Sequence, residues 1–449
     1  MFKRILIANR GEIALRIIRT CRDMGIESVL VYSDVDKDSL AVALADKAIC
    51  IGSASPNESY LDKKKIITAA ILTNSEAIHP GYGFLAENSE FAAMVQKNNL
   101  IFIGADAKVI KSMGDKILAR SIMEKAHVPV IPGSDEIRDI DSLKLYAREI
   151  GYPVLLKASQ GGGGKGMRIV NEESDLERSF LDAKKEAKNA FGDDTIYIEK
   201  YIINAKHIEV QILADKFGNV IHLGERDCSI QKNNQKLIEE APASTLSLKV
   251  QKNMRQVALE ATKSVGYVGA GTFEFLVTED AFYFIEMNVR IQVEHPVTEM
   301  ITGVDIVKEQ IRIAYGLNLS INNNLNFSGH AIECRINAQN VKQNFFPSVG
   351  KINDCYFPQG PNVRVDSGIS RDSEILPYYD SMIAKIIVHG ATRLEAIKRM
   401  RRALVELVID GIETTSDLDY LILHHPVFVL GKYNTKFLDC YLDEMIEVL

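Results

Sequence analysis

Residues 271–295, GTFEFLVTEDAFYFIEMNVRIQVEH, decide the fold expected for this chain. Two apolar and aromatic runs, Thr272–Val277 and Phe282–Met287, flank a short acidic turn, and this pattern predicts a β-hairpin. Counting outward from the turn places Glu274 directly opposite Glu286. Facing residues of an antiparallel pair are about 5 Å apart at Cβ, so two carboxylates there repel each other unless a cation lies between them.

The expected register of this hairpin takes residues 279–281 as the loop and pairs Thr278 with Phe282. Strand alternation then gives one row of polar side chains on the face that carries Glu274 and Glu286. That row continues through Asn288, Arg290, Gln292 and Glu294, whereas Phe273, Phe275, Phe284 and Ile285 supply the apolar packing. Oxygen ligands of this kind are typical of Mg²⁺ shared with nucleotide phosphates. The alternative is a solvated hairpin face with scattered charges.

Length and composition set limits on the class of protein. At 449 residues the chain is too long for one small core, and two to four domains are expected. A net charge of −7 argues against a nucleic-acid partner. Six cysteines without a CxxC or Cys/His spacing favour a reduced, cytoplasmic protein. Only four consecutive apolar residues precede Asn9 and no run approaches a membrane span, so neither a signal peptide nor a membrane partner is expected.

Residues 1–114 alternate strand and helix signals and therefore predict a parallel, helix-covered sheet. The turn after the first strand, Asn9-Arg10-Gly11, lacks the glycines of a dinucleotide fingerprint. His79–Phe84, HPGYGF, follows an apolar run and is rich in turn formers, so we expect it at the carboxyl edge of the sheet, where such folds bind ligands. From residue 204 onward the pattern is α+β.

A glycine-rich loop, Gly161–Gly166, lies between two short apolar strands, Val154–Ala158 and Met167–Val170. It is not a dinucleotide loop, because no helix follows it directly, and it is not a Walker A loop, because Lys165 is followed by glycine. A strand, loop and strand of this kind predict a mobile hairpin lid whose backbone N–H groups close over phosphate oxygens. The alternative is a flexible surface hairpin.

Several other residues have functional interpretations that the sequence leaves open. Lys116 and Lys157 are suited to a polyphosphate, and segment 199–202 is suited to donating backbone hydrogen bonds to an adenine edge. Arg335 lies between a cysteine and an isoleucine on an expected strand, so its side chain points to the opposite face, toward a cleft. The alternative for each is an ordinary surface or strand position.

Five motifs in order show a resemblance that covers essentially the whole chain. They are ANRGEIA at 8–14, HPGYGFL at 79–85, the glycine-rich segment 157–167, GERDCS at 224–229, and EMN at 286–288 continuing to HPVTE at 295–299. Together they closely resemble the biotin carboxylase family, the ATP-grasp subunit of bacterial acetyl-CoA carboxylase. The resemblance implies an α/β plus α+β fold with four parts. These are an N-terminal parallel-sheet domain (1–114), an ATP-grasp linker and mobile glycine-loop lid (115–203), an ATP-grasp core with the metal site (204–330) and a C-terminal domain (331–449).

The resemblance also assigns site residues by position. The implied ATP-binding residues are Lys116, Lys157, Gly163, Gly164, Glu199, Lys200, Ile202, His207, Gln231 and Asn234. The implied ligands of Mg²⁺ or Mn²⁺ are Glu274, Glu286 and Asn288. The implied bicarbonate site is Lys236, Arg290, Val293 and Glu294, with Glu294 as the base, and Arg335 is the arginine that faces the ureido oxygen of biotin.

The chain departs from the family pattern near the nucleotide. Asn234 stands where many relatives have histidine, and Lys232-Asn233 replaces a pair of arginines. Val289 and Val349 replace the commoner threonine or proline. The ring of charged contacts around ATP is therefore expected to be weaker, whereas the implied base and metal ligands are unaffected.

The implied activity is that of a ligase forming a C–N bond. It carboxylates the biotin of a biotin carboxyl carrier protein with ATP and bicarbonate, through carboxyphosphate, as the first half-reaction of acetyl-CoA carboxylase in fatty acid synthesis. Carboxyltransferase subunits are the further partners, and the family implies a homodimer with Arg19, Asp23 and Arg364 at its contacts. Two alternatives stay open: the equivalent subunit of a two-subunit pyruvate or 2-oxoglutarate carboxylase, and a non-catalytic ATP-binding module.

Overall fold

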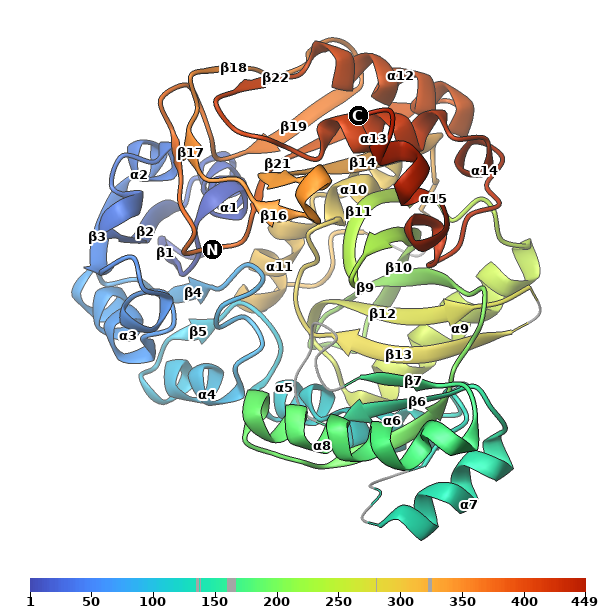
Figure 1. The fold of residues 1–449 in the computed structure, drawn as a ribbon. Helices are drawn as coiled ribbons and strands as arrows, with labels where there is room; N and C mark the ends of the chain where they lie inside the picture. Colours follow the sequence, from blue (N-terminus) through green and yellow to red (C-terminus); the bar gives the residue numbers. More distant parts are fainter. Residues whose placement is uncertain (135–136, 138, 160–166, 280, 322–324) are drawn as a thin grey trace.

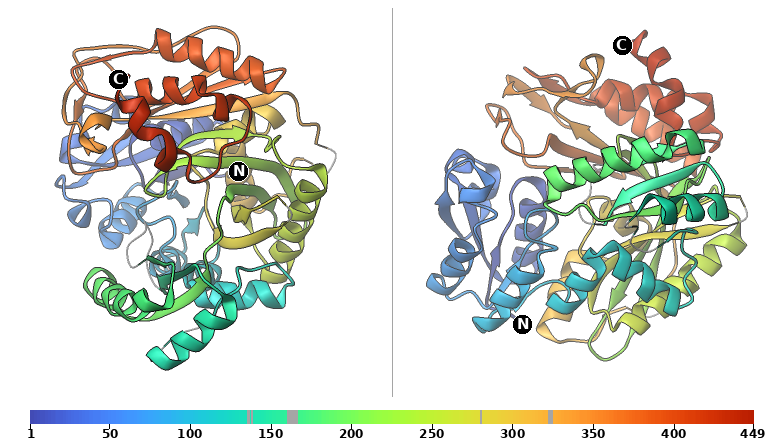
Figure 2. Two further views of the ribbon diagram at one scale, coloured as in Figure 1. Left: turned by 45° about the vertical axis from the view of Figure 1, so that its right-hand side comes forward. Right: turned by 60° about the horizontal axis from the view of Figure 1, so that its bottom comes forward.

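The computed structural model describes residues 1–134, 137, 139–159, 167–279, 281–321 and 325–449. In Figure 1 the N-terminal part (blue), a small lobe (teal and green) and the C-terminal helices (orange to red) surround one large sheet. In the right view of Figure 2 the N-terminal part (blue) lies beside the rest of the molecule, and the small lobe (teal and green) lies in front of the large sheet. The glycine loop, with Gly163 and Gly164, lies outside the described residues. Within the described ranges, no helix has the length and apolar character that crossing a membrane requires.

The N-terminal lobe is the parallel α/β sheet that the sequence predicts. Its strands lie in the order β3-β2-β1-β4-β5, and all neighbours are parallel. They are β1 (Arg4–Ile7), β2 (Glu27–Ser33), β3 (Lys47–Gly52), β4 (Ala77–His79) and β5 (Ile101–Phe102), with helices α1 (Gly11–Asp23), α2 (Leu40–Leu44), α3 (Lys63–Leu72), α4 (Ser89–Lys97) and α5 (Ala107–Gly114). Because β4 ends at His79, the HPGYGF segment leaves the carboxyl edge of the sheet, as expected.

The small lobe, residues 139–200, is named the lid. Its antiparallel sheet has the order β7-β6-β8 and is covered by two helices. Its elements are α7 (Ile140–Ile150), β6 (Val154–Ala158), β7 (Arg168–Val170), α8 (Leu176–Phe191) and β8 (Ile196–Lys200), and α6 (Lys116–Lys125) precedes it. Leu143, Leu156 and Phe180 belong to an apolar cluster that the lid forms from its own elements. The lid therefore has a core separate from the rest of the molecule.

The large sheet has eight strands in the order β13-β12-β9-β10-β11-β14-β21-β19, all antiparallel to their neighbours. These strands are β9 (Lys206–Ala214), β10 (Val220–Lys232), β11 (Gln235–Ala241), β12 (Gly269–Val277), β13 (Phe282–Asn288), β14 (His330–Asn337), β19 (Val363–Ser367) and β21 (Met382–Gly390). The sheet is shared by segments 204–330 and 331–449, whose separation into two domains stays a prediction.

Helices cover the large sheet, and short strands extend the C-terminal lobe. The helices are α9 (Leu248–Val265), α10 (His295–Thr302), α11 (Ile306–Tyr315), α12 (Arg393–Glu406), α13 (Ser416–His424), α14 (Pro426–Val429) and α15 (Phe437–Ile446). The short strands are β15 (Gln339–Asn340), β16 (Phe346–Pro347), β17 (Gly350–Lys351), β18 (Asp354–Tyr356), β20 (Glu374–Ile375) and β22 (Val408–Asp410). Gly266 ends α9 in the left-handed conformation, which glycine adopts without a Cβ clash.

The hairpin β12–β13 has the expected pairing at its carboxylates but not at its turn. Glu274 pairs with Glu286, and this prediction is confirmed. Phe282 pairs with Val277 and not with Thr278, so the predicted register at the turn is wrong by one residue.

A β-bulge reconciles the two ends of the hairpin. Phe275 pairs with Phe284 whereas Glu274 pairs with Glu286, so Ile285 is an extra residue on β13. The apolar role predicted for Ile285 is therefore wrong: its side chain is half-buried and lines a cavity beside Glu286. Strand alternation alone did not predict this, because a bulge turns two successive side chains to one face.

Candidate active site

A cavity of about 1380 Å³ lies between the lid, the large sheet and loops of the N-terminal lobe. The predicted site residues on its wall are Lys116, Lys157, Glu199, Lys200, Ile202, His207, Gln231, Asn234, Lys236, Glu274, Glu286, Asn288, Arg290, Val293 and Arg335. Glu294 is fully buried and hydrogen-bonded to two side chains of that wall. Residues that are far apart in the sequence thus meet at one cavity.

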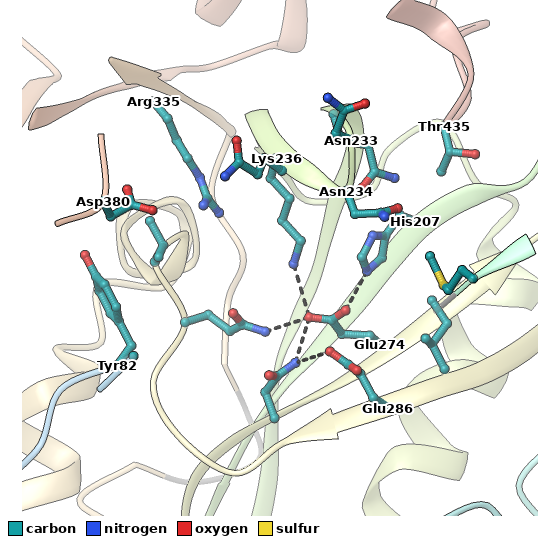
Figure 3. Close-up of a pocket in the computed structure, with 18 of the residues that line it drawn as sticks. Tyr82, His207, Asn233, Asn234, Lys236, Glu274, Glu286, Arg335, Asp380 and Thr435 are labelled. Carbon is teal, nitrogen blue, oxygen red and sulfur yellow. Dashed lines mark hydrogen bonds and ion pairs between the residues drawn. The ribbon is translucent and has the colours of Figure 1, made fainter. Parts of the chain in front are cut away.

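Glu274 on β12 is the centre of a hydrogen-bonded cluster, which Figure 3 shows as converging dashed lines. His207 Nε2 lies 2.8 Å from one carboxylate oxygen. The other oxygen accepts from Lys236 Nζ at 3.1 Å, from Asn288 Nδ2 at 2.8 Å and from Gln292 Nε2 at 2.7 Å. Burial alone would raise the pKa of Glu274, but Lys236 and His207 lower it well below its usual value. Glu274 is therefore a buried, ionised carboxylate.

Glu286, which faces Glu274 across the hairpin, has the opposite electrostatic balance. Burial and then the neighbouring Glu274 raise the pKa of Glu286. Asn288 Nδ2 lies 3.4 Å from Glu286 and also donates to Glu274, so this amide nitrogen joins the two carboxylates. Two facing carboxylates with hard oxygen donors suit a divalent cation such as Mg²⁺. The amide oxygen of Asn288 accepts from Arg290 and keeps a second lone pair.

Potential ligand atoms also group deeper in the floor of the cavity. Among the described residues, His207, Glu209 and Glu274 have ligand atoms within 4.8 Å of one another, and so do Glu209, Cys228 and Glu294. Glu209 was not predicted from the sequence, although strand alternation from His207 places it on the same face. The metal set of Glu274, Glu286 and Asn288 stays a prediction.

Lys236 and Arg335 hold Glu294 from two sides. Lys236 Nζ donates to Glu294 at 2.7 Å, and Arg335 donates to the other oxygen at 3.0 Å. Lys236 also contacts Glu209, and Arg335 Nε donates to Glu239 at 2.6 Å. Burial alone would raise the pKa of Glu294, but Lys236 and Arg335 lower it well below its usual value. Glu294 is thus an ionised carboxylate with both oxygens engaged.

Arg290 is fixed by a residue that no sequence pattern singles out. Its Nε donates to Glu87 at 2.8 Å, and Glu87 also accepts from the backbone N–H of Val289 at 3.2 Å. The guanidinium of Arg290 also donates to the amide oxygens of Asn288 at 2.8 Å and Gln292 at 3.1 Å. Glu87 belongs to the N-terminal lobe, about two hundred residues earlier, so only the folded chain shows this contact.

The lid contributes the cations at the opposite wall of the cavity. Lys157 on β6 forms an ion pair with Glu199 on β8 at 3.0 Å, and both side chains are buried. The predicted adenine edge at 199–202 is partly engaged within the protein. The N–H groups of Lys200 and Tyr201 donate to Pro132 at 2.7 Å and Pro153 at 3.1 Å, whereas Ile202 lines the cavity.

The departure at Asn233–Asn234 lies in the tight turn between β10 and β11. Both residues have positive φ, 51° and 63°, a conformation that asparagine tolerates better than most residues. Both line the cavity, and neighbouring Lys232 forms an ion pair with Asp439 at 3.4 Å. The expected weaker contact with a nucleotide stays a prediction.

The residues expected at a dimer contact do not share one environment. Arg19 and Asp23 are exposed on α1. Arg364 is engaged within the chain, because it donates to Glu299 at 2.7 Å and forms two hydrogen bonds with Asp366. The role of these residues in a dimer stays a prediction.

Two sheets that enclose a cavity, with lysines from the lid on one side and carboxylates from a hairpin on the other, define an ATP-grasp enzyme. The family models that match the chain are the biotin carboxylase N-terminal domain (residues 1–110), the carbamoyl-phosphate synthase L chain ATP-binding domain (115–322) and the biotin carboxylase C-terminal domain (333–440).

Known proteins match over nearly the full length. Biotin carboxylase 1 of Bacillus subtilis is 53% identical, covering 98% of this chain and 99% of the relative. A pyruvate carboxylase subunit of Methanothermobacter thermautotrophicus is 51% identical, covering 98% and 90%. The biotin carboxylase domain dimer of Hydrogenobacter thermophilus 2-oxoglutarate carboxylase, solved with MgADP, ADP and bicarbonate, has a TM-score of 0.96 and 49% identity over 99% of both chains.

The chain belongs to the biotin carboxylase family. It is an ATP-dependent carboxylase of the ligase class, with an ATP-grasp fold and with ATP, Mg²⁺, bicarbonate and biotin as its cofactors and substrates.

Proposed function

We propose that this chain is the biotin carboxylase subunit of an acetyl-CoA carboxylase, which carboxylates the biotin of a carrier protein before a carboxyltransferase moves the carboxyl group to acetyl-CoA. The observation that carries the carboxylation chemistry is the buried carboxylate of Glu294 held between Lys236 and Arg335 at the cavity wall. A carboxylate between two cations is suited to take a proton from an anionic substrate that those cations bind.

In this proposal bicarbonate binds to Lys236, Arg290 and the backbone at Val293. Lys236 lowers the pKa of Glu294. When bicarbonate also binds Lys236, this effect on Glu294 is weaker, so the pKa of Glu294 rises and Glu294 becomes a stronger base. Glu294 accepts the bicarbonate proton, and a bicarbonate oxygen forms a bond to the γ-phosphorus of ATP while the bond to ADP breaks. The product is carboxyphosphate, and the proton resides on Glu294.

The nucleotide lies between the lid and the hairpin. Lys116 and Lys157 offset phosphate charge, and Glu274 and Glu286 are the residues that would hold the metal ion. A bound Mg²⁺ supplies charge neutralisation at the phosphate oxygens, where phosphoryl transfer depends on positioning and electrostatics. Carboxyphosphate is readily hydrolysed, so exclusion of water from the cavity during the reaction favours transfer over loss.

Arg335 acts on the acceptor. The C–O bond of carboxyphosphate breaks to give CO₂ and phosphate. The phosphate takes the proton of the ureido N–H of biotin, and the nitrogen then forms the new C–N bond to CO₂. The guanidinium of Arg335 stabilises negative charge on the ureido oxygen, and this role is supported by its position on the cavity wall and its hydrogen bond to Glu294.

The test is ATP cleavage by the purified chain with Mg²⁺, in four mixtures with and without bicarbonate and free biotin. We expect cleavage that requires bicarbonate and rises further with biotin, together with carboxybiotin detected from ¹⁴C-bicarbonate. A rate of ATP cleavage that changes with neither bicarbonate nor biotin would contradict the proposal.

The pathway has a second candidate, because relatives named as pyruvate and 2-oxoglutarate carboxylase subunits are 51% and 50% identical to this chain. The two pathways differ only in the transferase component, since the biotin step is shared. Purification of the complex from cells, followed by carboxylation assays with acetyl-CoA, pyruvate and 2-oxoglutarate, separates them. If the complex carboxylates pyruvate or 2-oxoglutarate but not acetyl-CoA, the chain is the subunit of a pyruvate or 2-oxoglutarate carboxylase and not of an acetyl-CoA carboxylase.

A further inference from the structure

Residues 289–294, named the site loop, connect β13 to α10 without regular secondary structure. Two of its side chains are tied to the floor of the cavity: Gln292 donates to Glu274 and Glu294 accepts from Lys236. Because irregular backbone has few bonds of its own, its position depends on such outside contacts.

The backbone next to Glu294 has an anchor from the C-terminal lobe. Lys385 Nζ donates to the carbonyl oxygen of Val293 at 2.8 Å. Lys385 lies on β21, directly opposite Arg335 on β14 and Asp366 on β19, and its side chain is fully buried. A completely buried lysine is rare unless carboxylates pair with it.

The main carboxylate partner of Lys385 comes from the N-terminal lobe. Glu12, in the first turn of α1, lies 3.2 Å from Lys385 Nζ. The same oxygen of Glu12 accepts a hydrogen bond from the hydroxyl of Tyr82, which lines the cavity. Burial alone would lower the pKa of Lys385, but Glu12, then Glu333, raise it above its usual value, so the lysine stays charged.

One buried ion pair therefore links two parts of the cavity wall: Glu12 lines the cavity, and Lys385 lies behind it. Lys385 holds the carbonyl of Val293 on the site loop, and Glu12 holds Tyr82 on the HPGYGF segment. Because Glu12 and Lys385 form an ion pair directly, the contact at Val293 and the contact at Tyr82 are connected without a further residue between them.

We propose that Lys385 is a positioning residue for the carboxylation reaction, which fixes Glu294 in reach of bicarbonate through the carbonyl of Val293, with Glu12 holding the lysine in place. The inference rests on the proposed function, in which Glu294 is the base. Lys385 does not line the cavity. Its effect comes from geometry, since a displacement of about 1 Å at a reacting group costs roughly 10²-fold in rate.

The first test is Lys385→Met, which keeps the length of the side chain and removes the charge and the donor. We expect kcat for bicarbonate-dependent ATP cleavage to fall roughly 10²-fold. The Kd for ATP and its KM should stay within about twofold, because the site loop and not the nucleotide wall is displaced. Lys206→Met is the matched control: Lys206 pairs with Asp227 at 3.0 Å, is half-buried and does not line the cavity. It should lose stability without losing kcat.

A double variant separates positioning from stability. Lys385→Met leaves Glu12 as a buried carboxylate without its cation, which is destabilising. Lys385→Met with Glu12→Gln removes that uncompensated charge while the amide still accepts from Tyr82, so Tm should recover toward the wild-type value. If Lys385 is a positioning residue, kcat stays low in the double variant, because the anchor on Val293 is still absent.

The outcomes are distinct. Recovery of kcat together with Tm in the double variant, or wild-type kcat in Lys385→Met, would overturn the inference and leave Lys385 a structural residue. Absence of bicarbonate-dependent cleavage in the wild-type chain would instead overturn the proposed function, so the two failures are distinguishable. If Lys385→Met does not fold, the double variant alone decides, with the wild-type chain and Lys206→Met as references.

Discussion

The lid and the floor of the cavity hold their charged side chains in different ways. On the lid, Lys157 pairs with one carboxylate of the described chain, Glu199, at 3.0 Å. On the floor, formed by β9–β13 and the site loop, Glu274 accepts from several donors and Lys236 contacts three carboxylates, as Figure 3 shows in part. The floor is therefore organised before substrates bind, whereas the lysine of the lid has to exchange one partner for a phosphate.

The apolar cores of the floor and of the lid also differ, because the core of the floor is shared with another lobe and the core of the lid is not. Phe273, Phe275 and Met287 of the floor belong to a large cluster that includes Leu6 and Phe91 of the N-terminal lobe. The lid packs its own cluster, which includes Leu143, Leu156 and Ile198 and is joined by Ile137 just before the lid. Changes on the floor should therefore affect the chemical step, and changes on the lid should affect nucleotide binding.

The largest effect is expected from Glu294→Gln on the floor. The amide keeps the shape and one acceptor but cannot take a proton, so turnover should fall about 10³-fold, within the range for loss of a general base. The Kd for ATP should be unchanged, because Glu294 contacts Lys236 and Arg335 and not the lid. Steady-state kinetics and equilibrium binding of a fluorescent nucleotide measure the two. Retained bicarbonate-dependent turnover would remove Glu294 as the base.

A smaller loss of turnover, roughly 10²-fold, is expected from Glu286→Gln, since removing one preorganised electrostatic group typically costs this much. In metal-free protein the same substitution should raise Tm, because it removes the repulsion by which Glu274, after burial, raises the pKa of Glu286. Activity over a range of Mg²⁺ concentrations and thermal unfolding in EDTA measure both. A lower Tm without metal would contradict the repulsion.

Those features of the floor that depend on a local sequence pattern could be predicted from the sequence. The period of two in the hairpin puts Glu274 opposite Glu286, and the pairing survives the wrong turn because the bulge at Ile285 restores the register. The sequence analysis did not predict Glu209, although the same period of two, applied from His207 along β9, places Glu209 on the same face.

The contacts that the sequence did not predict join distant segments. Glu87 reaches Arg290, and Lys385 reaches Val293, across 203 and 92 residues respectively. No local periodicity carries such information, because these pairs form only when the lobes pack around the large sheet. Most of the described residues that the family resemblance assigns line one cavity, and contacts from outside their motifs hold Arg290 and Val293 in place.

On the lid, Lys157→Met should weaken ATP binding about 10-fold while kcat at saturating ATP stays within about threefold, as expected for an interaction made equally in ground and transition states. Lys184→Met on α8 is the control, because Lys184 pairs with Asp194 at 3.2 Å and does not line the cavity. Isothermal titration with ADP and initial rates measure the difference. A kcat loss as large as that of Glu286→Gln would mean that lid and floor act on the same step.

The last effect concerns stability and pH and leaves the chemical step aside. Burial, and then Arg16, lower the pKa of His79 in the N-terminal lobe to about 3, below the value of about 6.5 expected in an unfolded chain. The unfolded state thus binds one more proton between these values, so the folding equilibrium should weaken up to about tenfold per unit as pH falls from 6.5 toward 3. Segment 139–200 contains no histidine, so the lid lacks this dependence. Hydrogen exchange from pH 7.5 to 5 should show falling protection in β1 and β4 but little change in β6 and β8, and His79→Asn should flatten the first trend. Parallel loss of protection in both regions would show that the lid has no stability of its own.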